Sequence, residues 1–310
     1  MTTRSPSARR AGVLAVVLTS VLWGTTGTAA TFAPDAGPLA IGSAALGIGG
    51  LLQGLIALPS LRRSRPLLRA SGGTLTLGAL AVAVYPLAFY SSMHLAGVAI
   101  GSVVSLALAP LATGVIERVV DGRRLGACWL GCAVAGALGA AMLVVSRDDG
   151  AAGSPARTAL GACLGVLAAA TYATYSWASH RLMAAGAPHS AAMGAVFGAG
   201  GLPLMPVLAL TGAPLVATPE ARAVAAYMAL VPMFLGYVLF GVGLARLPAS
   251  TATTITLLEP AVAALLAVVV LGERLTALGW VGLGTLAAVL VVLVTGPQDA
   301  GERPTGARPS

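Results

Sequence analysis

Glu259 is the strongest candidate in this sequence for a residue that exchanges a proton or binds a solute. It is the tenth residue of an apolar segment at 250–271, whereas the other carboxylates fall in expected loops or tails or at segment ends. At the centre of a bilayer a charged side chain costs about 2.5–3.5 kcal/mol by insertion scales, and such residues are functional by default. Because burial disfavours the charged form, Glu259 could exchange a proton or bind an ammonium group. The alternative is a protonated Glu259 that is hydrogen-bonded to Thr256, one turn away, and only pins helices together.

Aromatic side chains form the second candidate set, because several of them lie well inside apolar segments. Their rings could contact a cationic amine through cation–π interactions, with membrane-interface anchoring or plain packing as the alternative. The members are Trp23, Tyr85, Tyr90, Tyr172, Tyr175, Trp177 and Tyr237, and the first five are the expected cavity residues. Two of them, Trp23 and Tyr172, stand at corresponding places in the two halves of the chain and could face one another across a cavity.

Two prolines lie in the middle of apolar segments. Pro110 and Pro260 each remove a backbone donor and free the carbonyl four residues earlier, at Leu106 and Thr256. Freed backbone at membrane depth is tolerated where it lines a cavity or finds a hydroxyl partner. We therefore expect kinks that serve as gates, or kinks that serve only helix packing.

Several other chemistries are not supported by the residues. The chain contains no Lys, which excludes a P-loop, and its three His and three Cys residues lack the spacing of metal ligands. One deep acid without a deep His does not make a catalytic constellation, so we expect no enzyme, cofactor or metal. The net charge of +8 comes from Arg residues between apolar runs, which does not fit nucleic-acid binding.

The composition identifies the elements that must position these residues. Apolar residues make up 57% of the 310 residues, charged residues only 9%, and the mean hydropathy is +0.90. Soluble domains carry about 25% charged residues, so this is an integral membrane protein. Continuous apolar runs favour helices over a strand barrel, and about 20 residues cross a bilayer. The predicted all-α fold has ten transmembrane helices at 11–33, 38–58, 71–92, 97–117, 125–145, 158–178, 190–211, 223–244, 250–271 and 276–295.

The distribution of Arg residues predicts the orientation. With a cytoplasmic N-terminus, fourteen of the eighteen Arg residues fall in inside segments, as the positive-inside rule requires. Both termini are then cytoplasmic, in the cell membrane. Residues 1–10 form the N-terminal tail, 146–157 an extracytoplasmic linker, and 297–310 a disordered C-terminal tail.

The two halves of the chain resemble each other at an offset near 150 residues. Leu108-Ala109-Pro110 matches Leu258-Glu259-Pro260, and Asp121-Gly122-Arg123-Arg124-Leu125 matches Leu271-Gly272-Glu273-Arg274-Leu275. The repeats, 11–145 and 158–296, contain five spans each. Because five is odd, the second repeat must be inverted relative to the first, which is typical of secondary transporters.

The sequence also resembles the EamA-type permeases of the drug/metabolite transporter superfamily. The resemblance rests on Leu22-Trp23-Gly24-Thr25, Leu258-Glu259-Pro260 and Leu271-Gly272-Glu273-Arg274-Leu275, and the two repeats cover nearly the whole chain. The first half departs from this pattern, with Ala109 and Arg123 where the second half has Glu259 and Glu273. The resemblance implies an exporter of small solutes such as amino acids, other metabolites or drugs.

These observations together predict a secondary active transporter that exports a small organic solute by alternating access with proton coupling. The alternatives are an uncoupled facilitator or an importer of a small metabolite. The expected partners are the solute, the lipid bilayer and a proton, and a homodimer remains open.

Overall fold

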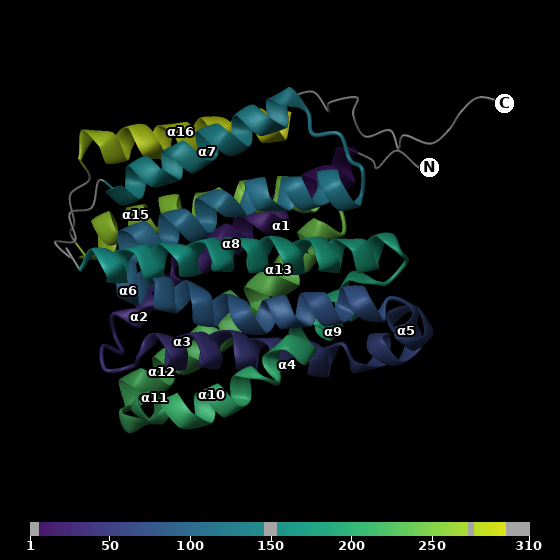
Figure 1. Ribbon diagram of the computed structural model, residues 1–310, viewed down its shortest axis with the longest axis horizontal. Helices are drawn as coiled ribbons and strands as arrows, with labels where there is room; N and C mark the ends of the chain where they lie inside the picture. Colours follow the sequence, from purple (N-terminus) through teal and green to yellow (C-terminus); the bar gives the residue numbers. More distant parts are fainter. Residues whose placement is uncertain (1–5, 146–153, 272–275, 296–310) are drawn as a thin grey trace.

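The computed structural model describes residues 6–145, 154–271 and 276–295, and the regular elements within these ranges are all helical. A helix satisfies its backbone hydrogen bonds internally, which long apolar segments require in a bilayer. Most of the long helices lie side by side along the long dimension of the molecule (Figure 1). The prediction of an all-α fold is therefore confirmed for the described residues.

The first half of the chain combines straight helices with helices interrupted by short irregular turns. One interruption, η1, is a π-helical segment that continues directly from α3 into α4. The elements are α1 (Pro6–Gly24), α2 (Thr26–Ala30), α3 (Pro38–Gly42), η1 (Ser43–Ile48), α4 (Gly49–Ile56), α5 (Leu58–Ala70), α6 (Gly72–Val120) and α7 (Ala127–Val145).

The second half is interrupted at two comparable places. A π-helical segment, η2, joins α12 to α13, and a 3-10 turn, η3, joins α14 to α15. The elements are α8 (Pro155–Ala184), α9 (His189–Gly201), α10 (Leu204–Thr211), α11 (Ala213–Ala217), α12 (Pro219–Met228), η2 (Ala229–Leu235), α13 (Gly236–Leu244), α14 (Ala249–Ile255), η3 (Thr256–Leu258), α15 (Glu259–Leu271) and α16 (Ala277–Thr295).

The long helix α6 contains two antiparallel rods. A Cβ built on Gly101 would lie 2.6 Å from the backbone nitrogen of Met93. In a straight helix, residues eight positions apart are separated by about 12 Å along the axis. The chain must therefore turn back between the segments Gly72–Ala96 and Gly101–Val120, each long and apolar enough to cross a membrane. Figure 1 shows the chain leaving α5, running to the opposite end of the molecule and returning.

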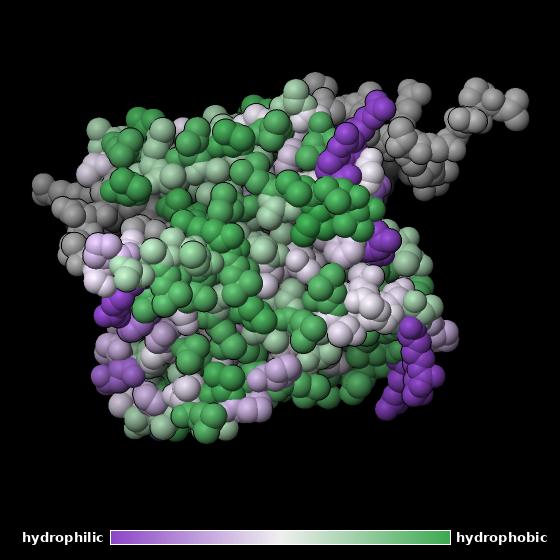
Figure 2. Space-filling model, viewed as in Figure 1, coloured by the Kyte–Doolittle hydropathy of each residue, from purple (hydrophilic) through white to green (hydrophobic). Residues whose placement is uncertain are grey.

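Seven helical stretches of the described residues, several of which join consecutive elements, are long and apolar enough to cross a membrane. The bent pair α9 and α10 would make an eighth. The shorter apolar stretches Ala127–Met142 and Ala277–Leu293 belong to α7 and α16, at the positions of the fifth and tenth predicted spans. Large apolar side chains are exposed along the helices, among them Val119, Leu210 and Val269 at 76–85%. Figure 2 shows that apolar residues dominate the viewed face while hydrophilic ones gather near its ends. A multi-pass membrane protein follows from this surface, whereas the number ten stays a prediction.

The two halves of the chain pack mainly against each other. Helix α6 packs against α8, α1 against α13, α4 against α9, and α7 against α16. Each of these pairs joins one helix of the first half to one of the second. The core is therefore shared between the halves and does not divide into two separate bundles.

The bundle has two distinct ends. Helices α2, α11 and α12 and the start of α3 lie at one of them, on the left in Figure 1, which we call the α12 end. Helix α5, the last turns of α6 and α8 and the first turn of α14 lie at the other, the α5 end. Among the described Arg residues, only Arg157 and Arg222 belong to elements at the α12 end.

Several predicted boundaries differ from the structure. Residues 59–70, which connect two predicted spans, are not a loop but belong to the helix α5. This helix follows the apolar run of the second span and contains Arg62, Arg63, Arg65 and Arg69. Helix α8 is longer than the predicted 158–178, because Pro155 occupies its first turn and the Ser154 hydroxyl accepts a hydrogen bond from the Arg157 N–H at 3.4 Å. The tail at 297–310, most of the linker at 146–157 and the motif residues 272–275 lie outside the described residues.

Candidate functional site: a pocket around Glu259

A narrow pocket lies between the two halves of the bundle, in the part that faces the α12 end. The space in and beside it that is free of protein atoms, open solvent included, is about 370 Å³. Glu259 is the charged residue of its lining, and most of the other residues are aromatic or aliphatic. The lining consists of Trp23, Thr26, Gly42, Ala45, Leu46, Tyr85, Pro86, Phe89, Tyr90, Met233, Tyr237 and Glu259.

An irregular stretch of backbone positions Glu259. The predicted effect of Pro260 is to free the carbonyl of Thr256, and in the structure this carbonyl accepts from the Glu259 N–H through the 3-10 turn η3. Helix α15 then begins at Glu259 itself. Pro110, in contrast, is buried within the second rod of α6, which continues as an α-helix, and it is not part of the pocket lining.

Thr256 takes other partners than Glu259. Its hydroxyl donates to the Thr253 carbonyl at 2.8 Å, and it also lies 2.8 Å from the Tyr172 hydroxyl. A threonine hydroxyl has a single proton, so Tyr172 must be the donor in the second bond. Within the described part of the chain, the Glu259 carboxyl group has neither a side-chain hydrogen bond nor an ion pair. The pairing between Glu259 and Thr256 that a purely structural role would use is thus absent from this structure.

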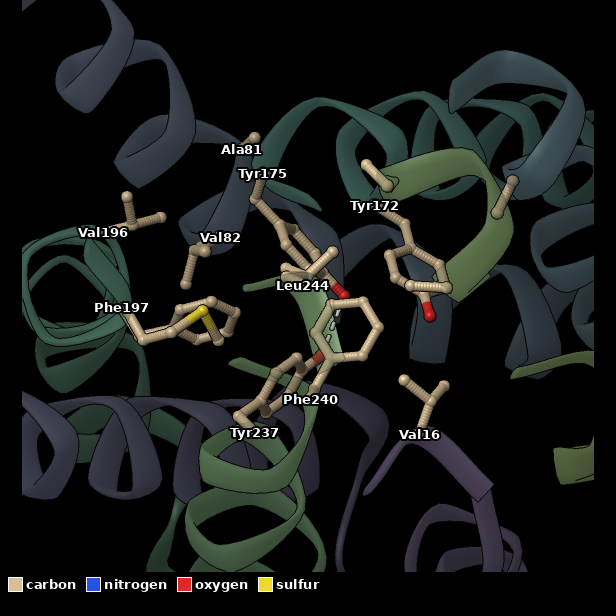
Figure 3. Close-up of a cluster of buried hydrophobic side chains, with 14 of the residues drawn as sticks. Val16, Ala81, Val82, Tyr172, Tyr175, Val196, Phe197, Tyr237, Phe240 and Leu244 are labelled. Carbon is tan, nitrogen blue, oxygen red and sulfur yellow. Dashed lines mark hydrogen bonds between the residues drawn. The ribbon is translucent and has the colours of Figure 1, made fainter. Parts of the chain in front are cut away.

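The aromatic residues form one connected cluster of ring contacts. Figure 3 shows its buried part, with Tyr172, Tyr175 and Tyr237 among the labelled side chains. The rings of Trp23 and Tyr172 meet edge to face with their centroids 6.1 Å apart. The rings of Tyr85 and Tyr172 pack with their centroids 5.6 Å apart. The Tyr175 and Tyr237 hydroxyl groups form a hydrogen bond of 2.8 Å. The cluster joins the lining of the pocket to the main core of the bundle.

The predicted aromatic residues thus take two positions. Trp23, Tyr85 and Tyr90 line the pocket, whereas Tyr172 and Tyr175 are almost fully buried behind it and are not part of its lining. Further lining rings come from Tyr237, a member of the predicted aromatic set, and from Phe89, which the sequence does not separate from packing residues. Phe89 lies one turn after Tyr85, and this helical spacing is the signal that could have identified it.

Close helix approaches explain why glycines accompany these rings. A Cβ built on Gly24 would lie 2.7 Å from the Val262 Cβ and 2.9 Å from the Glu259 carbonyl oxygen, so only glycine lets α1 reach α15 here. A Cβ on Gly236 would lie 2.8 Å from the Trp23 Nε1 atom. That nitrogen donates a 3.0 Å hydrogen bond to the Pro232 carbonyl, inside the π-helical segment η2. The Trp23-Gly24 motif therefore places the glycine against the backbone of Glu259 and the indole ring against Pro232 and Gly236.

A second polar cluster, which the sequence did not indicate, lies at the α5 end. Glu117, only 2% exposed, accepts a 2.6 Å hydrogen bond from the Ser250 hydroxyl and a 3.3 Å bond from the Ser250 N–H. Its carboxylate also pairs with Arg123 at 3.2 Å. Glu117 thereby connects the last turn of α6 to the first turn of α14, helices that the internal repeat relates to each other.

Asp121 ties α6 to α8 at the same end. Its carboxylate accepts a 2.7 Å hydrogen bond from the Trp177 Nε1–H group and forms an ion pair with Arg181. The Arg181 guanidinium also lies over the Trp177 ring, 5.3 Å from its centroid. Together with the Glu117 contacts, these bonds hold the ends of α6, α8 and α14 against one another.

Two comparisons of the sequence with known proteins point to transporters, and one comparison of the structure finds the same fold. The sequence model of the EamA-like transporter family matches residues 10–145 and again 159–295. An uncharacterized transporter of Bacillus subtilis (strain 168), YwfM, is 30% identical over 287 residues, which is 92% of this chain and 94% of that protein. A solved crystal structure superimposes with a TM-score of 0.74 over 92% of this chain and 96% of its own, at 19% identity, and this likeness shows the fold alone.

Proposed function

Since the chain belongs to the EamA-like transporter family, we propose that it is a secondary transporter that exports a small organic solute by alternating access. The observation that carries this proposal is a pocket, in the half of the bundle toward the α12 end, that contains a deep carboxyl group without a hydrogen-bond or ion-pair partner among the described residues. Intramembrane carboxylates are rare and commonly mark the path of a substrate or proton.

The route from the pocket to the α5 end is blocked in two layers. Directly beneath Glu259, the Tyr172–Thr256 bond and the buried Thr253 and Thr254 fill the space between α8 and α14. Beyond them, Glu117 holds Ser250 at the helix start. Transport to the other side requires both layers to separate while the α12 end closes, which is the alternating exchange that we propose.

The two family matches support a two-repeat mechanism. Each matched segment corresponds to five predicted spans, and an odd number inverts the second segment relative to the first. Inverted repeats can exchange conformations, so that the pocket opens to one side and then to the other. On this basis all ten predicted helices, including α7 and α16, cross the cell membrane.

The Arg distribution supports an orientation. The Arg residues of α5 and of the neighbouring helix ends support a cytoplasmic α5 end under the positive-inside rule, together with cytoplasmic termini. The pocket then faces outward, in the state from which an exporter releases its solute. Glu259 carries the coupling proton or contacts the solute directly.

The test compares wild-type protein with Glu259→Gln at equal membrane levels. Cells that express the wild type should accumulate one or more compounds in the medium, and reconstituted vesicles should move these compounds faster when a pH gradient is imposed. Glu259→Gln should abolish export or its response to the gradient. Glu220→Gln, which removes an exposed carboxylate at the α12 end, is the matched control and should leave both unchanged.

Other outcomes would replace parts of the proposal. Export by Glu259→Gln at the full rate and with an intact pH response would return Glu259 to a structural role. Movement down a gradient without any pH response would indicate an uncoupled facilitator, and depletion of a compound from the medium would indicate an importer.

A further inference from the structure

We infer that the pocket selects an organic cation: a compact amine with an aromatic or other apolar body, in preference to an anionic or neutral solute of the same shape. This inference rests on the proposed function and narrows it to a substrate class. It depends on the charges, rings and hydrogen-bonding groups that line the pocket.

The charge of the pocket is the first argument. Glu259 provides its single carboxyl group, and neither Arg nor His is part of the lining. At the α12 end, the described bases Arg157 and Arg222 are exposed residues outside the lining. A carboxylate or phosphate on the solute would meet no counter-charge there and would be repelled by an ionised Glu259. An ammonium group would gain an opposite charge in surroundings that exclude water, where charge interactions are strong.

The rings supply the second argument. Trp23, Tyr85, Phe89, Tyr90 and Tyr237 present aromatic surface to the same narrow space as Glu259. The electron-rich face of a ring attracts a cation, and this attraction grows when the cation is desolvated. The same rings offer apolar contact to the body of the amine, so charge and shape favour one kind of solute.

The hydrogen-bonding groups of the lining point the same way. The Trp23 N–H group is occupied by the Pro232 carbonyl, the Thr26 hydroxyl donates to the Trp23 carbonyl at 2.7 Å, and the Tyr237 hydroxyl is bonded to Tyr175. Two of the lining donors, the Trp23 N–H group and the Thr26 hydroxyl, are thus already used within the protein and are not available to an anion or a sugar. The hydroxyl groups of Tyr85 and Tyr90 can donate as well as accept, and their oxygens can accept from an ammonium N–H group, so the preference for a cation comes mainly from Glu259 and the rings.

Three probes that share a phenyl ring test the selectivity. They are 2-phenylethylammonium, 3-phenylpropionate and 3-phenyl-1-propanol, and their binding to the purified full-length protein in detergent is measured by calorimetry. We expect the cation to bind at least about tenfold more tightly than either of the others. Equal binding of the three, or tighter binding of the anion, would overturn the inference.

Variants assign the selectivity to the pocket. Glu259→Gln should remove the preference for the cation and leave the binding of the neutral probe unchanged, whereas the control Glu220→Gln should change neither. Tyr90→Leu should weaken cation binding by several-fold, and Tyr90→Phe, which keeps the ring, should weaken it less. If Glu259→Gln does not fold, the Tyr90 pair decides the matter, and equal affinities for Tyr90→Leu and the wild type contradict the inference.

Transport by reconstituted vesicles separates this inference from the proposed function. Ala45→Leu fills the pocket and should block both binding and transport. If an anionic or neutral solute crosses the bilayer in an Ala45-dependent manner while 2-phenylethylammonium neither binds nor competes, the transporter proposal stands and the cation inference is wrong. If the cation binds with the expected selectivity and none of the tested solutes, including this cation, crosses, the inference stands and the transporter proposal is wrong.

Discussion

The two ends of the bundle treat their carboxylates in opposite ways. At the α5 end, Glu117 is buried among a hydroxyl group, a backbone N–H and an Arg side chain, all within 3.3 Å. Near the α12 end, Glu259 lies in a pocket without a hydrogen-bond partner in the described structure. A buried charge that has partners holds helices together, whereas one without partners costs stability unless a ligand or proton meets it.

The backbone differs between the same two regions. Around the pocket, the helices are interrupted by the π-helical segments η1 and η2 and by the 3-10 turn η3. The last turns of α6 and α8 at the α5 end are regular α-helix. Such interruptions are frequent at functional sites, because they leave carbonyl groups free and allow helices to bend. We therefore infer that the pocket around Glu259, which we call the working region, takes part in transport. The contacts of Glu117 and Asp121 at the α5 end, which we call the seal, hold that end of the bundle closed.

The largest effect is expected for Glu117→Gln, which tests whether the seal is structural. The substitution weakens the charge-assisted bonds to Ser250 and removes the ion pair with Arg123, so the free energy of unfolding should fall by about 2 kcal/mol. Glu259→Gln should not lower it, because the carboxyl group has no hydrogen bond or ion pair with the described residues to lose. Thermal denaturation in detergent, followed by tryptophan fluorescence, measures both.

A second readout follows the opening of the seal. In a background without Cys128, Cys132 and Cys163, a thiol reagent should label Thr253→Cys faster when Glu117→Gln is also present, because Thr253 lies buried just beneath Ser250. The exposed Glu220→Gln is the control for both measurements. Equal destabilisation by Glu117→Gln and Glu259→Gln would remove the contrast between the two ends.

A smaller effect is expected at the floor of the pocket. Tyr172→Phe removes the donor to the Thr256 hydroxyl oxygen in the core and should cost about 1 kcal/mol of unfolding free energy. Tyr85→Phe removes a hydroxyl without a hydrogen-bond partner among the described residues, so it should be close to neutral. The same denaturation experiment compares them, and a larger loss for Tyr85→Phe would show that the pocket hydroxyl is the one that stabilises the fold.

The sequence predicts the working region better than the seal, for physical reasons. Glu259 and Trp23 stand out because a charge or an indole ring deep in an apolar run is unusual. Pro260 predicts the irregular backbone beside Glu259, because proline removes a backbone donor. Glu117 has no such signal: it lies at the end of a predicted span, where carboxylates are common, and its partner Ser250 is 133 residues away. The π-helical segment η1, Ser43–Ile48, likewise has the composition of any membrane helix. Long-range partners and backbone hydrogen-bond shifts depend on packing, which hydropathy does not encode.

The smallest effect is expected for Asp121→Asn at the outer layer of the seal. Its ion pair with Arg181 is half open to solvent, since the two side chains are 30% and 46% exposed, and exposed pairs contribute about 0–1 kcal/mol. The asparagine oxygen can still accept from the Trp177 N–H group, so we expect a loss of about 0.5 kcal/mol that vanishes in high salt, where the ion pair of the wild type is screened. The loss for Glu117→Gln, at a carboxylate only 2% exposed, should persist in high salt. Denaturation of both variants at low and high salt therefore shows which contact contributes more to closing the α5 end. If Asp121→Asn lowers the free energy of unfolding more than Glu117→Gln does, and the loss persists in high salt, Asp121 holds this end closed and Glu117 is secondary.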